Sequence, residues 1–184
     1  MTRSHFLLDT SVLSEARCAK PVEEVARFLR ALPKGSVAVP TWTIFELERG
    51  GQMLRLIDAP RAIPLLRWLD DLLETDVFVP PTNAEIHRLI ARMSVVPELR
   101  RFWSGSAGST KMRFGSDPSI AAVAIHYEMP IATRDIRDFM LIHSHFPLPG
   151  LFDPYRSRWF VEPVGEWRMA FDRTCTENAP MMWM

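Results

Sequence analysis

The sequence predicts an α/β fold in which about five strands form a central parallel sheet with helices on both faces. Short apolar runs, which are typical of buried strands, alternate along the chain with longer segments whose apolar residues recur at helical spacing. Strands separated by helices usually pair in parallel through right-handed crossovers. The alternation therefore predicts a three-layer sandwich.

The predicted strands are short and end at polar or proline residues. The first ends on Asp9, directly after the apolar run of residues 6–8. The second ends at Pro40, because proline cannot continue a central strand. The five predicted strands cover residues 5–9, 35–40, 76–81, 129–133 and 147–152.

The predicted helices fill most of the chain between these strands. One of them is expected to hold Pro64 in its first turn, where proline is tolerated. Residues 104–116 are rich in glycine and serine and predict a loop. The predicted helices cover residues 21–32, 41–58, 61–74, 83–96 and 117–128.

Length and composition indicate one globular domain with an appendage. The chain has 184 residues, of which 47% are apolar and 24% charged, and its formal net charge is zero. A neutral chain has no bulk attraction for nucleic acid or membrane, so an anionic partner has to meet a local basic patch. We expect a domain over residues 1–153 and a C-terminal extension over residues 154–184.

Cysteine content and hydropathy favour a cytoplasmic protein that makes no membrane contact. The two cysteines, Cys18 and Cys175, form neither a disulfide framework nor a zinc-binding pattern. No apolar run reaches the length of a membrane span, and the N-terminus lacks the apolar core of a signal peptide.

Four acidic residues are expected to meet at one edge of the sheet. Asp9 ends the first strand, Glu46 lies in the helix after the second, and Asp135 follows the fourth. Asp117 opens the helix that returns to the fourth strand, so this helix also begins at the carboxyl edge. Ligands of open parallel sheets bind outside this edge.

Carboxylates that converge repel one another unless a counter-charge is present. Mg²⁺ or Mn²⁺ relieves such repulsion, because these ions prefer oxygen ligands and are often held by a few carboxylates together with substrate phosphate. A bound ion of this kind lowers the pKa of a water and stabilises the charge on a phosphodiester. The acids therefore predict hydrolysis of a phosphate ester by water.

Three segments resemble PIN-domain ribonucleases and, more closely, VapC-type toxins of bacterial toxin–antitoxin pairs. These segments are "FLLDTSVLSE", "TIFELERG" and "DPSIAAVAIHYEMPIATRDIRDF", within a resemblance that covers roughly residues 5–153. It implies a PIN-like fold and an endoribonuclease that depends on Mg²⁺ or Mn²⁺. It also implies an RNA substrate, a small VapB-like antitoxin, a homodimer and a cytoplasmic location.

The same resemblance assigns roles to individual residues. Asp9, Glu46, Asp117 and Asp135 would be the catalytic, metal-binding acids. Thr10 or Ser11 would be a polar neighbour that lines the site. Asp138 could share the role given to Asp135, because the segment after the fourth strand reads "DIRD".

Each acid also has a structural interpretation. Asp9 could cap the following turn, and Glu46 could complete a capping box with Thr43. Asp117 fits the first turn of a helix, where the helix dipole favours anions. Asp135 and Asp138 could be loop charges paired with Arg134 and Arg137. Four such coincidences at one edge of one sheet are a weaker explanation than a shared acidic site.

The remaining candidates are weaker. His143 and His145 are more typical of polar loop residues than of metal ligands, because no third ligand accompanies them. Trp42, Trp68 and Trp103 are more typical of core or interface than of base stacking. A basic group could meet RNA phosphates or form a solvated charged loop, and the two interpretations are equally favoured. This group comprises Arg100, Arg101, Lys111 and Arg113.

Two other classes of function compete with a nuclease. A phosphatase of the haloacid dehalogenase type also begins with a strand that ends in Asp-x-Asp, but Ser11 stands at the second position here. The other alternative is a catalytically silent PIN-like module that binds RNA or protein. The intact set of acids favours the nuclease.

Overall fold

The computed structural model describes residues 5–104 and 113–163. Its strands are β1 Phe6–Leu8, β2 Val37–Ala38, β3 Ile131–Ala132, β4 Leu151–Asp153 and β5 Arg158–Val161. The helices in these ranges are α1 Thr10–Ala16, α2 Glu23–Ala31, α3 Thr41–Arg55, α4 Ala59–Leu73, α5 Ala84–Ser94, the 3-10 helix η1 Pro97–Phe102, α6 Ser116–Tyr127 and α7 Ile136–His145. The predicted α/β class is confirmed.

The five strands form one sheet in the order β2-β1-β3-β4-β5. The pairs β1–β2, β1–β3 and β3–β4 are parallel, as the sequence predicts, so the carboxyl ends of these strands lie at one edge. The β4–β5 pair is antiparallel, and here the expectation of a wholly parallel sheet is wrong. A short connection forces this arrangement, because parallel strands need a long crossover.

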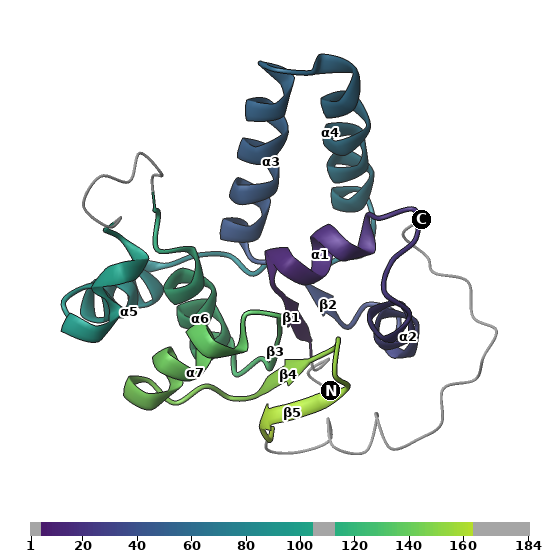
Figure 1. Ribbon diagram of the computed structural model, residues 1–184. Helices are drawn as coiled ribbons and strands as arrows, with labels where there is room; N and C mark the ends of the chain where they lie inside the picture. The colour runs from purple at the N-terminus through teal and green to yellow at the C-terminus, as the bar shows by residue number, and fades with distance from the viewer. Residues whose placement is uncertain (1–4, 105–112, 164–184) are drawn as a thin grey trace.

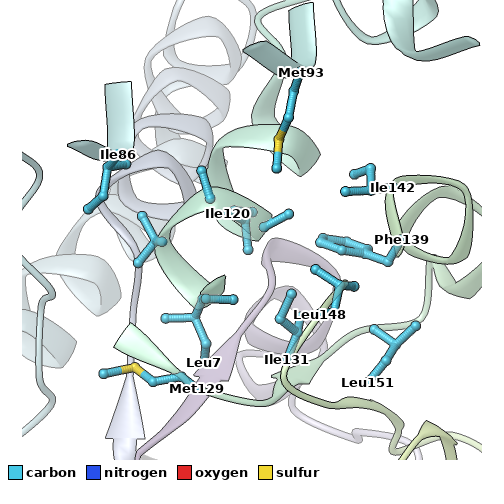
Figure 2. Close-up of a cluster of buried hydrophobic side chains, with 14 of the residues drawn as sticks. Leu7, Ile86, Met93, Ile120, Met129, Ile131, Phe139, Ile142, Leu148 and Leu151 are labelled. Carbon is cyan, nitrogen blue, oxygen red and sulfur yellow. The ribbon is translucent and has the colours of Figure 1, made fainter. Parts of the chain in front are cut away.

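Side chains of β1 alternate between the two faces of the sheet and reach separate cores. Leu7 packs in a core that α5, α6 and α7 complete on one face (Figure 2). Phe6 and Leu8 pack on the other face in a core formed with α1 and α2 and with residues from α3 and α4. This alternation follows from the two-residue period of a strand. The predicted three-layer arrangement with helices on both faces is confirmed (Figure 1).

Helices α3 and α4 lie side by side and project away from the sheet (Figure 1). Gly51 permits their close contact, because a Cβ at this position would lie 2.5 Å from Cδ2 of Leu66. Pro64 lies inside α4 rather than in its first turn, since the helix begins at Ala59. Asp58 caps this earlier start by accepting a hydrogen bond from the backbone N–H of Arg61 at 3.1 Å.

The structure corrects several predicted elements. The strand predicted over residues 76–81 is only one parallel bridge between Phe78 and Ala38, and two prolines follow it. Helices α1 and α7 and strand β5 were not predicted. The two helices are short, with seven and ten residues, so each offers few repeats of the helical period.

The expected domain boundary after residue 153 falls inside the hairpin that joins β4 to β5. Asp153 is fully buried and accepts a hydrogen bond from Nη1 of Arg156 at 2.7 Å, which holds the turn. Trp159 of β5 packs on Phe152 of β4 with ring centroids 4.9 Å apart. Residues 158–161 therefore belong to the sheet as β5, and residues 164–184 lie outside the described part of the chain.

Within the described ranges, no helix has the length and apolar character needed to span a membrane.

Candidate functional site

Asp9 lies where β1 ends and α1 begins, and it is only 4% exposed. Its carboxylate accepts hydrogen bonds from the backbone N–H groups of Thr10 at 2.7 Å and Ser11 at 3.4 Å. Asp9 is thus the N-cap of α1, as its structural interpretation expects. The cap fixes the carboxylate at the edge of the sheet, so the structural role also positions the charge.

Hydroxyl groups from two segments hold the other side of the same carboxylate. Ser11 Oγ and Thr133 Oγ1 each donate to Oδ2 of Asp9 at 2.7 Å. These hydroxyls in turn accept from the chain after β3: Arg134 N donates to Ser11 Oγ at 3.1 Å, and Asp135 N donates to Thr133 Oγ1 at 2.9 Å. This network ties the carboxyl ends of β1 and β3 together.

Glu46 reaches this edge from the first half of α3. Its Oε2 accepts a hydrogen bond of 2.5 Å from Oγ1 of Thr10. The capping-box interpretation is wrong, because α3 begins after Pro40 without a side-chain cap. Thr43, the supposed partner, is buried, and its hydroxyl has no hydrogen-bond partner in the described residues.

Asp117 is the second residue of α6 and follows a tightly constrained glycine. Gly115 has φ +65°, in the left-handed region, and its N–H donates to the carbonyl of Phe102 at 2.9 Å. A Cβ on Gly115 would lie 2.3 Å from Nε1 of Trp103. Backbone conformation and close packing thus fix the start of α6, and with it the position of Asp117.

Replacing Gly115 by alanine is expected to lower the free energy of unfolding by about 2–4 kcal/mol, because left-handed strain adds to overpacking against Trp103. Gly50→Ala is the control: Gly50 lies inside α3, and a Cβ there would meet no atom within 4 Å, so alanine should be neutral or slightly stabilising. Urea denaturation of both variants measures the difference. Equal stability of the two variants would contradict the constraint at Gly115.

Asp135 and Asp138 occupy different surroundings around the start of α7. Asp135 is the N-cap residue, and its carboxylate makes no capping hydrogen bond. Asp138 forms an ion pair with Nη2 of Arg101, which η1 supplies. The loop-charge interpretation pairs Asp138 with Arg134 or Arg137, and for Asp138 this pairing is wrong, because its partner is Arg101.

The four predicted acids line one hollow of about 480 Å³ at the carboxyl edge of the sheet. Thr10, Ser11 and Arg134 also line it, whereas Asp138 does not. The structure thus brings together residues from β1, α3, α6 and the β3–α7 connection. We call it the acidic hollow; besides Asp9, Glu46, Asp117 and Asp135, a fifth acid, Glu15 of α1, lines it.

The electrostatics of Asp117 show that these carboxylates act on one another. Burial is the largest cause of a rise in the pKa of Asp117 from 3.8 to about 8. The charges of Asp9, Asp138, Glu46 and Asp135 add to this rise, in that order. Asp117 is therefore mostly protonated at neutral pH when no counter-charge is present.

The pKa values of two neighbouring acids shift in the same direction. Burial raises the pKa of Asp9, although hydrogen bonds from Ser11, Thr133 and Thr10 oppose the rise. Burial and then the charge of Asp9 raise the pKa of Asp135, and Arg134 opposes this rise. A bound cation would therefore stabilise the ionised carboxylates of the hollow, which repel one another when no cation is present.

The donor set fits a hard divalent cation in chemistry and charge. All four acids supply oxygen ligands, which Mg²⁺ and Mn²⁺ prefer. In residues 5–104 and 113–163, however, no three Asp, Glu, His or Cys side chains are arranged so that they could hold a metal ion as they stand. Binding would therefore require the carboxylates to turn toward one another.

The weaker candidates have structural roles. His143 lies in α7 rather than in a loop, and its Nδ1 accepts from the backbone N–H of Leu148 at 3.0 Å. His145, at the end of α7, lies 4.0 Å from a carboxylate oxygen of Glu98. Trp42 and Trp103 pack against one core and Trp68 against the other.

The four basic residues that the sequence suggested for RNA binding do not share one environment in the fold. Arg101 pairs with Asp138, and Arg100 is exposed on η1. Arg113 donates to the carbonyl of Arg101 at 3.0 Å. Lys111 lies outside the described residues.

Sequence reasoning missed three residues around the acidic hollow. Thr133 binds Asp9 directly, and its position at the end of the strand predicted over residues 129–133 was the available signal. Arg134 lines the hollow and lies over the ring of Tyr155, 5.6 Å from its centroid. Tyr155 donates to the carbonyl of Ser11 at 3.3 Å, and its place in the supposed extension concealed this role.

No protein-family model matches this chain, and no curated protein sequence matches it. Among solved structures, a chain of VapBC-1 from nontypeable Haemophilus influenzae is 20% identical with a TM-score of 0.54, and the match covers 81% of this chain and 97% of that one. A chain of VapBC2 from Rickettsia felis, bound to a DNA fragment from their promoter, is 16% identical with a TM-score of 0.50 and coverages of 74% and 92%. These similarities show a shared fold.

Proposed function

We propose that this chain is a Mg²⁺- or Mn²⁺-dependent endoribonuclease of the VapC type, the toxin of a toxin–antitoxin pair. The acidic hollow carries the proposal, because Asp9, Glu46, Asp117 and Asp135 reach it from four separate segments. Burial, and then the charges of the neighbouring acids, raise the pKa of Asp117 to about 8. The resemblance in sequence and the fold shared with a VapBC-1 chain support it. A cytoplasmic location accompanies this role.

The roles of the residues follow from their contacts. Asp9, Glu46, Asp117 and Asp135 would hold the metal, which when bound supplies an activated water and a charge that stabilises the reacting phosphodiester. Ser11 and Thr133 hold the carboxylate of Asp9, and Thr10 holds that of Glu46. The acid after β3 would be Asp135 rather than Asp138, because Asp135 lines the hollow and Asp138 pairs with Arg101.

Arg134 is one of two arginines, with Arg17, that line the acidic hollow and could meet a substrate phosphate there. It lines the hollow beside Asp135, and the ring of Tyr155 supports its guanidinium. A guanidinium binds phosphate oxygens through paired hydrogen bonds. Arg134 would therefore offset the repulsion between the acids and an RNA backbone.

The test is cleavage of RNA by the purified chain in Mg²⁺ or Mn²⁺ and in EDTA. Internal cleavage is expected only with a divalent ion. Full activity in EDTA would overturn the proposed chemistry.

A catalytically silent RNA-binding module is the second candidate. The observation that favours it is that no three acids in the described residues are arranged to hold a metal as they stand. Retention of intact RNA by the chain at every Mg²⁺ and Mn²⁺ concentration, in a binding assay run beside the cleavage assay, would support this candidate and exclude the nuclease.

We further propose a homodimer that binds a small VapB-like antitoxin protein. Some apolar side chains of α3 and α4 are used inside the monomer, since Leu47 and Leu69 are buried. Exposed apolar side chains instead gather toward the junction of α3 and α4, where such a surface favours an interface. They are Met53 at 48% exposed, Leu56 at 82%, Ile57 at 84% and Ile63 at 49%.

Co-expression of the chain with its neighbouring gene product is expected to yield a stable complex that elutes as a dimer of the chain or larger. The Leu56→Asp/Ile57→Asp variant should weaken assembly at least about tenfold, because it charges the two most exposed apolar side chains of the interface. Size exclusion with light scattering measures the mass. Arg55→Asp is the control for added charge, and a monomer without a bound partner would contradict the toxin assignment.

A further inference from the structure

A second hollow adjoins the acidic hollow and shares Glu46 and Asp117 with it. Its volume is about 340 Å³, and its walls include Phe45, Arg49 and Phe114. We call it the aromatic pocket. Because the two hollows share two acids, a strand that crosses the acidic hollow would place an adjacent group in the aromatic pocket.

Two phenylalanine rings form a corner of this pocket. The centroids of Phe45 and Phe114 are 5.3 Å apart, with their ring planes at 77°. Trp42 supports Phe45 from another direction at 5.7 Å. Phe45 is nevertheless 39% exposed, which packing in the core does not explain. Exposed aromatic faces of this kind provide stacking surfaces for unpaired nucleobases.

The chain holds Phe114 firmly beside this corner. Gly115, the next residue, is hydrogen-bonded to Phe102 and packed against Trp103. On one face of Phe114 lies the guanidinium of Arg49, 5.1 Å from the ring centroid. Rings that are fixed before binding lose little entropy when they meet a ligand.

Two arginines give the aromatic pocket a positive side. No carboxylate in residues 5–104 and 113–163 forms an ion pair with Arg49 or Arg113. Both line the pocket, opposite in charge to the acids at its border. Guanidinium groups that lack acidic partners are suited to bind phosphate.

We propose that the aromatic pocket binds one unpaired nucleobase of the RNA strand, next to the bond that is cleaved. Phe45 stacks on the base, Phe114 meets the edge of the base because the two rings stand at 77°, and Arg49 and Arg113 hold a flanking phosphate. A volume of about 340 Å³ accommodates one nucleoside and is at the small end of ligand pockets, roughly 300–1,000 Å³. The substrate class is therefore single-stranded RNA or a loop, because a base in a duplex cannot leave its stack without cost. This inference rests on the proposed nuclease function.

The test is binding of a fluorescent single-stranded oligoribonucleotide in EDTA, where the proposed nuclease does not cut. Phe45→Ala is expected to weaken binding about tenfold or more, since stacking on an aromatic side chain contributes about 1–3 kcal/mol per base. Phe45→Tyr keeps the ring and should stay within about twofold of the wild type. Leu73→Ala is the control: this apolar side chain of α4 is 40% exposed, close to the 39% of Phe45, and lies outside the pocket, so its loss should leave binding unchanged.

An abasic nucleotide placed in turn at each position of the oligonucleotide locates the stacked base. At one position, the abasic nucleotide should weaken binding to the wild-type protein about as much as Phe45→Ala weakens binding of the intact oligonucleotide. The Phe45→Ala protein should bind this abasic oligonucleotide no more weakly than the intact one. Additive losses, or a Phe45→Ala protein that binds RNA as tightly as the Leu73→Ala control, would overturn the pocket. So would a Phe45→Ala protein that keeps RNA binding and loses only its protein partner.

Binding and cleavage fail separately, so the two proposals can be told apart. If the wild type cleaves RNA and Phe45→Ala binds normally, the nuclease stands and the pocket is wrong. If binding depends on Phe45 but no condition gives cleavage, the pocket stands as a base-binding site and the nuclease is wrong.

Discussion

Replacing Asp117 by asparagine is expected to abolish RNA cleavage, with a loss of at least about 100-fold, and to leave the fold intact. Asparagine keeps the size of the side chain but removes a carboxylate that lines the acidic hollow. The same loss is expected for Asp9→Asn, because Asp9 lies at the meeting point of the hydrogen-bond network. Initial rates of cleavage and circular dichroism measure activity and fold.

Two comparisons sharpen this prediction. Asp135→Asn should reduce cleavage far more than Asp138→Asn, since Asp135 lines the hollow and Asp138 pairs with Arg101. Asp70→Asn, on the exposed surface of α4, is the control and should cleave like the wild type. A larger loss in Asp138→Asn than in Asp135→Asn would reassign the fourth acid.

The metal-free protein is expected to lose stability as the pH rises from about 4 to about 8. In this window the folded protein keeps a proton on Asp117, whose pKa is about 8, whereas the unfolded chain releases it near 3.8. The folded state thus binds more protons, and its free energy of unfolding falls by up to about 1.4 kcal/mol per pH unit for one proton. The burial-raised pKa values of Asp9 and Asp135 act in the same direction.

Asp117→Asn removes the contribution of Asp117 to this dependence on pH. Its gain in stability over the wild type should be near zero at pH 4 and on the order of a few kcal/mol at pH 8. Urea denaturation in EDTA at both pH values measures the difference, and titration of other groups cancels in the comparison. An equal difference at both values would contradict the raised pKa of Asp117.

Mn²⁺ is expected to stabilise the wild type in the same buffers. At a concentration 100 times its dissociation constant, the melting temperature should rise by roughly 5–10 °C. The rise should be larger at pH 8 than at pH 6, because the ion competes with the proton on Asp117. Asp117→Asn should show little rise, and absence of a rise in the wild type at millimolar Mn²⁺ would count against a metal site.

The acids of the hollow were predictable because simple topology places them. Asp9 and Asp135 follow strands that are parallel neighbours, so one edge must hold both. The partners of these acids were harder to predict, because they depend on tertiary contacts. Arg101 pairs with Asp138 across 37 residues, and Thr133 donates to Asp9 across 124. Neither residue type indicates such a contact by itself.

The missed elements share a physical cause. Strand β5 has four residues, none of them buried, and depends on pairing with β4, so its sequence has little periodicity of its own. Phe78, by contrast, has the apolar surroundings of a strand, but two prolines follow and only one bridge forms. Short segments take their structure from neighbours that a local pattern does not identify.

The central claim is that the carboxylates of the acidic hollow bind a divalent ion on which RNA cleavage depends. The most direct measurement is a Mn²⁺ titration of the metal-free wild type and of Asp9→Asn, with bound Mn²⁺ from electron paramagnetic resonance and cleavage rate recorded in the same samples. The account predicts that occupancy and rate rise together in the wild type, and that both are lost in Asp9→Asn. Wild-type cleavage in EDTA, or undiminished cleavage by Asp9→Asn, would contradict it.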